Sequence, residues 1–282
     1  MLPHQHGCGQ LGDDMMLTRE LLAALASHPN VTAAILIALG CETNRSAHLL
    51  AAIRRRGGIA HGVGIQAAGG IEEAIDQAEH VLRAHHRPDL HEASVDSSEL
   101  KVGVVADATA RVREPALVAS VAESLRDNGF VVIVPVDPDM PLRPAENHRG
   151  PLAIPARWRS EPRSENALLK LLVEGPVADS QRVPVGDDLV ERMTAVTALG
   201  AHVLVCLNGR PSLVGAALAP TISVSMNPEI DGLDDLIDVP FAGDDLAGRV
   251  VAEVHAVIAG RQTHAERLGM RDLALPRLGP WY

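Results

Sequence analysis

Aromatic residues are scarce in this 282-residue chain, which holds two Trp, one Tyr and two Phe. Positive charge is also short, because 36 acidic residues outweigh 25 Lys and Arg and give a formal net charge of −11. Few aromatic rings are therefore available for base stacking, and the net charge opposes a phosphate backbone. We predict that nucleic acid is not a partner.

Long apolar runs and a leader segment are missing as well. No run reaches the roughly 18 residues needed to cross a bilayer, and no charged segment followed by an apolar one opens the chain. The only cysteines are Cys8, Cys41 and Cys206. An odd number of distant cysteines fits reduced thiols better than a disulfide framework, and metal ligation stays open to them. We expect a cytoplasmic protein with no membrane partner.

The first half of the chain alternates helical and strand patterns, and the hydrophobic content of 46% is enough for a sizeable core. Apolar spacing predicts a helix over Leu17–His28, and the continuous apolar run Val31–Leu39 is typical of a strand covered on both faces. A second helix begins after Asn44, which we predict to cap it, and a third runs over Ile71–Leu82.

The second half repeats this alternation after a polar stretch that we interpret as a domain boundary or long crossing loop. Strands are predicted at "KVGVV", "FVVIV", "HVLVCL" and "TISVSM", and helices from Pro115 to Gly129 and near residues 164–174, 187–199 and 245–259. Residues 135–163, rich in Pro and Arg, form either a flap over a site or a loop. We predict an α/β fold of two Rossmann-like parallel-sheet units with flanking helices, in domains 1–90 and 98–282.

Three stretches carry residues suited to chemistry. The opening "MLPHQHGCGQ" crowds two histidines and Cys8 among glycines, and is either a site or a frayed terminus. "GCETN" directly follows the first strand, where Cys41 is either a small buried filler or part of a site beside Glu42. "NGRPSLVG" follows a later strand, where Arg210 either forks onto a substrate carboxylate, helped by nearby amides, or is solvated in an ordinary turn.

Five segments resemble, in the same order, the altronate and galactarate dehydratase family. They are "LPHQHGCGQ", "HPNVTAAILIALGCETN", "IQAAGG", "GRPSLVGAALAPTISVSMNPE" and "GRQTHAERLG". Together they span nearly the whole chain, and the succession of "HxxGCG" and "HPN…GCE" is the most specific part. Members of that family remove water from sugar acids, and one branch includes the large subunit of a sulfolactate sulfo-lyase. The resemblance implies a divalent-metal lyase in carbohydrate catabolism that acts on a small anionic hydroxy acid.

The resemblance also assigns roles to residues. The catalytic candidates are His4, His6 and Glu42, and His6 ranks below His4 because relatives usually carry a small or hydroxyl residue there. The metal candidates are His4, Cys8, Cys41 and Glu42, for Fe²⁺ or else Mn²⁺ or Zn²⁺. The substrate-binding candidates are Asn44, Gly209, Arg210 and Asn227. Water removal needs a base for the α-hydrogen and a Lewis acid for the carboxylate or the departing hydroxyl, and the product is a 2-keto-3-deoxy acid.

The chain departs from the family pattern in three places. Relatives carry "PGNKAGG" before the segment that here reads "ENALLKLLVEG", and "CGGSDG" where this chain has "ADATARVREP". Met1 lies almost on the first motif, whereas full-length relatives have a small domain and further strands before it. Two alternatives therefore stand beside a compact hydro-lyase, namely a subunit of a split lyase such as a sulfo-lyase and a degenerate relative that binds a small acid. We expect a homo-oligomer, or a small partner subunit supplying the missing N-terminal part, that covers Val31–Leu39 and the helix Leu17–His28.

Overall fold

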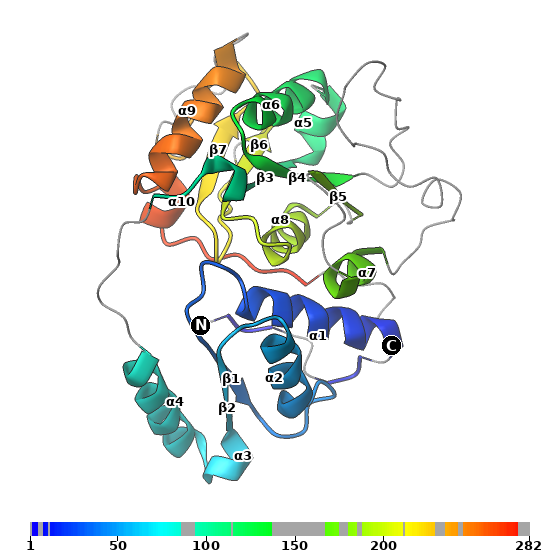
Figure 1. The fold of residues 1–282 in the computed structure, drawn as a ribbon, viewed down its shortest axis with the longest axis vertical. Coiled ribbons are helices and arrows are strands. Elements are labelled where there is room, and N and C mark those ends of the chain that lie inside the picture. Colours follow the sequence, from blue (N-terminus) through cyan, green and yellow to red (C-terminus); the bar gives the residue numbers. More distant parts are fainter. Residues whose placement is uncertain are drawn as a thin grey trace. The chain divides into compact units, whose positions relative to one another are not determined.

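The chain forms two compact units that divide between Ser94 and Val95 (Figure 1). The computed structural model describes residues 2–4, 8–10, 12–85, 94–113, 115–136, 167–174, 180–184, 188–210, 212–228, 235–241 and 245–275. Most of the Pro- and Arg-rich stretch predicted as a flap or loop therefore lies outside the described residues. Among the helices that are described, none is long and apolar enough to cross a membrane.

The first unit has helices on both faces of a two-stranded parallel sheet. Its elements are α1 (Gly12–Ala26), β1 (Ala34–Ala38), α2 (Ser46–Arg55), β2 (Ala60–Gly64), α3 (Ile65–Ala68) and α4 (Ile71–His85). Helices α1 and α2 pack on one face of the sheet through a cluster that includes Ala23, Ile53 and Leu36. Helix α4 packs on the other face, where Ala74 and Ala78 contact Val63 and Ile35. Successive residues of β1 thus alternate between the two faces, as a strand requires.

The structure adds one strand to this unit that the sequence analysis does not predict, and it shows one expectation to be wrong. Strand β2 escapes the sequence analysis because "AHGVG" contains two glycines and a histidine and shows no apolar run. Strand β1 is not covered on both faces along its length, since the side chain of Ile37 is 49% exposed. The described sheet holds only two strands, so β1 is an edge strand. Side chains on an edge strand have a neighbouring strand on one side only and are therefore less covered.

The second unit is built on a five-stranded parallel sheet in the order β5-β4-β3-β6-β7. Its strands are β3 (Lys101–Ala106), β4 (Val131–Val136), β5 (Ser180–Pro184), β6 (Val203–Asn208) and β7 (Thr221–Ser225). Its helices are the 3₁₀ turn η1 (Ser97–Glu99), α5 (Ala108–Arg113), α6 (Pro115–Asp127), α7 (Ala167–Glu174), α8 (Leu189–Ala198), α9 (Leu246–Ile258) and α10 (His264–Arg267). The chain builds outward from β3 to β5 and then returns to place β6 on the other side of β3, so the topological switch point lies between β3 and β6.

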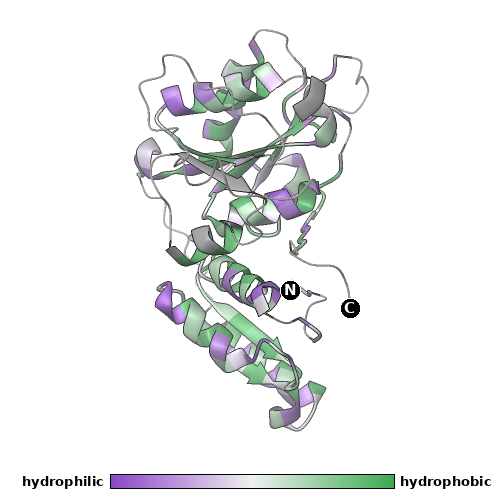
Figure 2. Ribbon diagram, turned by 90° about the vertical axis from the view of Figure 1, so that its right-hand side faces the viewer, coloured by the Kyte–Doolittle hydropathy of each residue, from purple (hydrophilic) through white to green (hydrophobic). Residues whose placement is uncertain are grey.

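The core of this unit follows from the alternation along the strands. Val102, Val104 and Ala106 of β3 face a cluster completed by apolar residues of α6 and α9. Gly103 faces the opposite side, where a Cβ atom would lie 2.3 Å from Val196 of α8 and 2.5 Å from Leu204. The absent side chain therefore lets α8 lie close against the sheet. Figure 2 shows the hydrophobic colour along the strands and a mixture of both colours on the helices.

The predicted fold class, α/β with parallel sheets and flanking helices, is confirmed. Strand β5 and helix α5 are absent from the sequence analysis. "SQRVP" has too few apolar residues to predict a strand, and "ATARVR" is too short to show helical periodicity.

Candidate functional site

A tight loop at the carboxyl end of β1 carries the first group of candidate residues. Gly40 has a φ of +124°, a left-handed value that favours glycine. A Cβ atom at this position would also lie 2.6 Å from Oε1 of Gln66. The chain can therefore reverse here and present Cys41 and Glu42 immediately after the strand.

The carboxylate of Glu42 closes this loop on itself. Its Oε2 accepts the backbone N–H of Gly40 at 2.9 Å, and its Oε1 accepts the backbone N–H of Leu39. Desolvation by burial alone would raise the pKa of Glu42, but the backbone hydrogen bonds and the nearby His4 outweigh it and lower the pKa below its ordinary value. Glu42 is therefore a fixed negative charge at neutral pH.

The N-terminal segment brings His4 and Cys8 to the same loop. The thiol of Cys8 approaches the backbone oxygen of Cys41 at 3.9 Å and interacts with the Cys41 side chain. Partial desolvation lowers the pKa of His4, and the Glu42 charge offsets this only in part. Desolvation, followed by the neighbouring Cys41 and Glu42, raises the pKa of the Cys8 thiol. The structure thus gathers one neutral imidazole, two exposed thiols and one carboxylate, whereas His6 lies outside the described residues.

These four side chains do not form a ready coordination sphere. In the part of the chain that the structure describes, no three His, Cys, Asp or Glu side chains are grouped so that they could hold a metal ion. Both oxygens of Glu42 also accept backbone hydrogen bonds. The four side chains that the resemblance implies as metal ligands, His4, Cys8, Cys41 and Glu42, thus lie at one loop without forming such a group among the described residues.

Asn44 makes structural contacts with helix α1. Its Oδ1 accepts the Nε–H of Arg19 at 3.1 Å, and its Nδ2 donates to the backbone oxygen of Met15 at 3.1 Å. The predicted helix cap is wrong, because the N-cap residue of α2 is Arg45. The buried amide of Asn44 instead ties the loop after β1 to α1.

The second group of candidates lies at the switch point of the five-stranded sheet. Asp107, directly after β3, accepts the backbone N–H of Ala110 on Oδ1 at 2.6 Å. Its Oδ2 accepts the backbone N–H groups of Gly209 at 3.0 Å and Arg210 at 3.3 Å, which follow β6. The amides proposed to hold substrate oxygens near Arg210 thus already bind a carboxylate of the protein itself.

Gly209 has a packing reason to be glycine. A Cβ atom there would lie 2.8 Å from the backbone nitrogen of Ala110 and 2.8 Å from Cγ2 of Thr109. The side chain of Arg210 is exposed beside this loop, while Asn227 lies partly buried after β7. Asp107 was missed by the sequence analysis, although its place directly after a predicted strand could have identified it.

Asn208 fixes the carboxyl ends of β6 and β7. Its Nδ2 donates to the backbone oxygen of Cys206 and to Oγ of Ser223, both at 3.1 Å. Burial, followed by the charge of Asp107, raises the pKa of Cys206 to about 12, despite a hydrogen bond with Asn208 that lowers it. Cys206 is thus a buried neutral thiol beneath the loop.

The last family motif contributes a hydrogen-bonded contact between Asp238 and His264 that anchors α10. Oδ1 of Asp238 lies 2.7 Å from Nδ1 of His264 and accepts the backbone N–H of His264 at 2.8 Å. Oδ2 of Asp238 accepts the backbone N–H of Ser223 in β7 at 2.8 Å. The sequence analysis assigned no role to this pair, because 26 residues separate its members.

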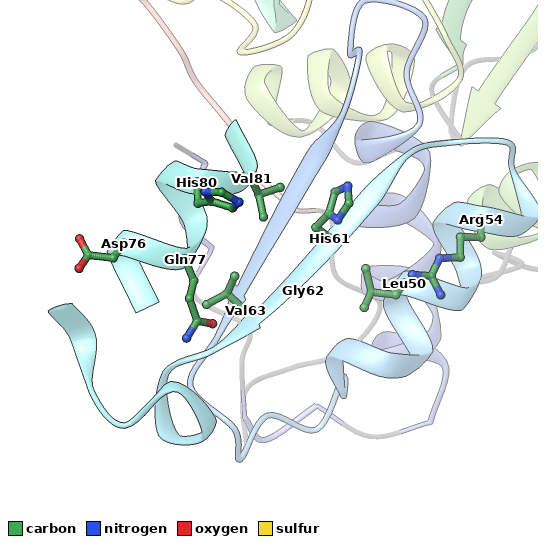
Figure 3. Close-up of a pocket in the computed structure, with 9 residues that line it drawn as sticks. All are labelled: Leu50, Arg54, His61, Gly62, Val63, Asp76, Gln77, His80 and Val81. Carbon is green, nitrogen blue, oxygen red and sulfur yellow. The ribbon is translucent and has the colours of Figure 1, made fainter. Parts of the chain in front are cut away.

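A pocket of about 660 Å³ in the first unit lies apart from these candidates along the edge of β2. Figure 3 shows His61 and Val63 of β2 between Leu50 and Arg54 of α2 and His80 of α4. The buried Nε2 of His61 has no hydrogen-bond partner among the described residues. None of the residues singled out from the sequence lines this pocket.

Comparison with known proteins gives two matches to family models. Residues 1–88 match the model described as D-galactarate dehydratase/Altronate hydrolase, second domain, and residues 183–281 match D-galactarate/Altronate dehydratase, C-terminal. Altronate dehydratase of Escherichia coli (strain K12) is 47% identical over 47 residues, which cover 17% of this chain and 10% of that protein. Altronate dehydratase of Bacillus subtilis (strain 168) is 41% identical over 54 residues, which cover 19% and 11%. The aligned segments thus span only a small part of the curated relatives.

Proposed function

Because the chain belongs to the D-galactarate/altronate dehydratase family, we propose that it removes water from a small hydroxy or sugar acid. The observation that carries this proposal is the cluster of His4, Cys8, Cys41 and Glu42 at the carboxyl end of β1, inside the segment that matches the family's second domain. Ligands of open α/β sheets bind at this end of the strands.

The chemistry assigns a role to each member of the cluster that can move or hold a proton. His4, neutral because its pKa is lowered, takes the proton from the carbon next to the substrate carboxylate. The electrons of that C–H bond form a C=C bond while the C–O bond of the neighbouring carbon breaks, and the departing hydroxide takes the proton from the imidazolium and leaves as water. The charge of Glu42 stabilises the imidazolium that His4 becomes. The enol product tautomerises to a 2-keto-3-deoxy acid.

A divalent metal, Fe²⁺ or else Mn²⁺ or Zn²⁺, is part of the proposal only as a cofactor to be tested. When bound, it would polarise the substrate carboxylate or the departing hydroxyl. Metal analysis of protein purified without chelator under reducing conditions tests it. We expect metal that is lost from Cys8→Ala and Cys41→Ala but kept in Cys206→Ala, and equal metal in all four proteins would exclude these ligands.

A second candidate function follows from the small share of the curated relatives that the chain matches. The amides of Gly209 and Arg210 are already bound by Asp107, where relatives carry "CGGSDG". This favours a subunit of a split lyase, such as a sulfo-lyase, or a relative that binds a small acid without turnover.

A substrate screen separates these functions. Aldonic, aldaric and sulfo-hydroxy acids are incubated with the chain and ferrous iron, and 2-keto acid and sulfite are measured. We expect 2-keto acid release that is lost in His4→Ala and Glu42→Gln and kept in the surface control Glu72→Gln. Sulfite release would support the sulfo-lyase, and binding of an acid without any product would support the degenerate relative.

A further inference from the structure

Two of the three cysteines lie against each other at the loop after β1. Cys8 and Cys41 are 33 positions apart, and both are free and exposed. The Sγ atom of Cys8 lies 3.9 Å from the backbone oxygen of Cys41, and the two thiol groups also interact by a side-chain hydrogen bond. Cys206 is free but buried in the second unit. The fold thus places two accessible thiols within reach of each other and buries the third.

One member of the pair is held in place and the other has room to move. The loop that carries Cys41 is closed by Glu42, whose carboxylate accepts two backbone N–H groups of the same loop. Cys8 is followed by Gly9, which has a φ of +85° and where a Cβ atom would meet no described atom within 4 Å. The sulfur of Cys8 can therefore approach that of Cys41 through a small shift of the N-terminal segment, while the loop after β1 stays closed.

The surroundings of the pair suit a neutral bond better than two charged thiolates. Desolvation, followed by the neighbouring Cys41 and Glu42, raises the pKa of the Cys8 thiol. Dithiols whose thiolates are stabilised form strongly oxidising disulfides, because the reduced state is then favoured. The reduced pair lacks that stabilisation at Cys8, and a disulfide carries no charge beside the Glu42 carboxylate. Both features favour the oxidised state of the pair.

We propose that Cys8 and Cys41 form a reversible disulfide by exchange with a low-molecular-weight disulfide, for which glutathione disulfide is the probe. The thiolate of one cysteine attacks a sulfur of glutathione disulfide, the S–S bond breaks, and one glutathione leaves and takes up the proton. The second cysteine loses its proton, attacks the mixed disulfide and releases the second glutathione. The two protein thiols are oxidised, and one glutathione disulfide is reduced to two glutathione molecules.

The disulfide joins the segment of His4 to the loop of Glu42. Its effect on activity rests on the proposed function, in which His4 takes the proton and Glu42 stabilises the imidazolium. Closure of the bond shifts the His4 segment, and displacement of a catalytic group by about 1 Å can lower a rate on the order of 100-fold. The bond also removes both thiols as metal ligands, because metals bind the thiolate. The oxidised protein is therefore the inactive form.

Equilibration of the full chain with glutathione tests the bond without any substrate. Reduced protein is incubated in mixtures of reduced and oxidised glutathione, the remaining thiols are blocked with iodoacetamide, and the peptides are mapped by mass spectrometry. We expect a linked pair of the Cys8 and Cys41 peptides, while Cys206 stays a free thiol. The pair should be half formed where the squared glutathione concentration divided by that of glutathione disulfide is on the order of millimolar or higher, the effective concentration of two neighbouring thiols.

Single replacements separate this pair from a general oxidation of thiols. Cys8→Ala and Cys41→Ala should each retain one glutathione as a mixed disulfide, because the thiol that would release it is missing. Cys206→Ala is the matched control and should form the linked pair at the same glutathione ratio as the wild type. Circular dichroism before and after oxidation verifies that each protein is folded.

A wild type without the linked pair, or one in which glutathione stays attached to Cys8 or Cys41, overturns the proposal. A bond to Cys206 or between two chains overturns it as well. In parallel, we expect 2-keto acid release to fall on the order of 100-fold in the oxidised protein and to return with dithiothreitol. A linked pair in a protein that releases no 2-keto acid in either state upholds the disulfide and counts against the proposed function. Activity that is unchanged by a complete disulfide overturns the inactive oxidised form.

Discussion

Asp107 holds Gly209 across the switch point of the five-stranded sheet, with Oδ2 accepting the backbone N–H of Gly209 at 3.0 Å. The two residues follow β3 and β6, the strands between which an open α/β sheet normally receives its ligand. The protein thus supplies its own carboxylate to amides that are well placed for an anion. Substitutions that remove this hydrogen bond should therefore destabilise the second unit.

Replacement of Asp107 by Asn should loosen the loop at the switch point. An amide offers one acceptor oxygen, so it cannot serve both Ala110 and the pair Gly209 and Arg210. We expect a loss of about 1–3 kcal/mol in the free energy of unfolding, measured by urea denaturation. Asp127→Asn, at the exposed end of α6, is the control. Equal stability of the two variants would contradict a stabilising role for the Asp107 hydrogen bonds.

Substitution of Arg210 by Lys tests whether this side chain, beside the Asp107 hydrogen bonds, binds the substrate anion. Lysine keeps the charge but loses the planar fork that pairs with a carboxylate in two bonds. We expect the KM for the acid that the substrate screen identifies to rise by about tenfold with little change in kcat. Unchanged KM values would show that Arg210 is a solvated turn residue.

The activity should depend on the protonation of His4. Its pKa is lowered mainly by desolvation, so the neutral base persists at pH values below the ordinary histidine range. We expect kcat/KM to increase with pH with a midpoint below the ordinary histidine pKa, because protonated His4 cannot accept a proton. His4→Ala should lower kcat/KM at least about 100-fold, while the exposed His48→Ala on α2 should not. A midpoint above the ordinary histidine value would exclude His4 as the base.

The three thiols should react with iodoacetamide at different rates. Cys206 is buried with a pKa of about 12, so it should remain unlabelled until the protein unfolds. Cys8 is exposed, but its raised pKa should slow labelling at pH 8 relative to glutathione. Glu42→Gln removes one of the charges that raise this pKa and should speed labelling of Cys8, unlike Glu72→Gln. Peptide mapping by mass spectrometry measures each rate, and rapid labelling of Cys206 in the folded protein would refute its burial.

Gly103→Ala should destabilise the second unit by about 1–3 kcal/mol, because the new methyl group would overlap Val196 and Leu204. Gly248→Ala in α9 is the matched control, since the nearest atom to its Cβ is the movable Oδ1 of Asp245 at 3.0 Å. Alanine also favours the helix, so this control should be neutral or stabilising by up to about 1 kcal/mol. Thermal unfolding separates the two outcomes, and a neutral Gly103→Ala would show that α8 can move away.

Much of the fold could be predicted from local patterns. The runs that became β3, β4, β6 and β7 are apolar because both faces of a parallel sheet are covered, and that requirement is visible in the residues themselves. Strand β2 could not be predicted, since only its pairing with β1 makes "AHGVG" a strand. The candidate residues of the first unit were visible as Cys41 and Glu42 after a strand and as a dense opening motif. The family resemblance also predicted that the loops His4–Gly9 and Gly40–Asn44 lie beside each other, which the approach of Cys8 to Cys41 confirms.

The sequence by itself determined the class of the fold, the family and the loops in which polar side chains follow strands, because these depend on residue type and spacing along the chain. The tertiary structure alone decided that Asn44 hydrogen-bonds to α1 and that Asp107 accepts the backbone N–H of Gly209 in the loop after β6. It also decided that Ile75 and Leu82 are exposed. Each of these outcomes depends on which distant segment lies alongside. Contacts between residues 29 or 102 positions apart are set by the packing of whole helices and strands, not by the local pattern at either end.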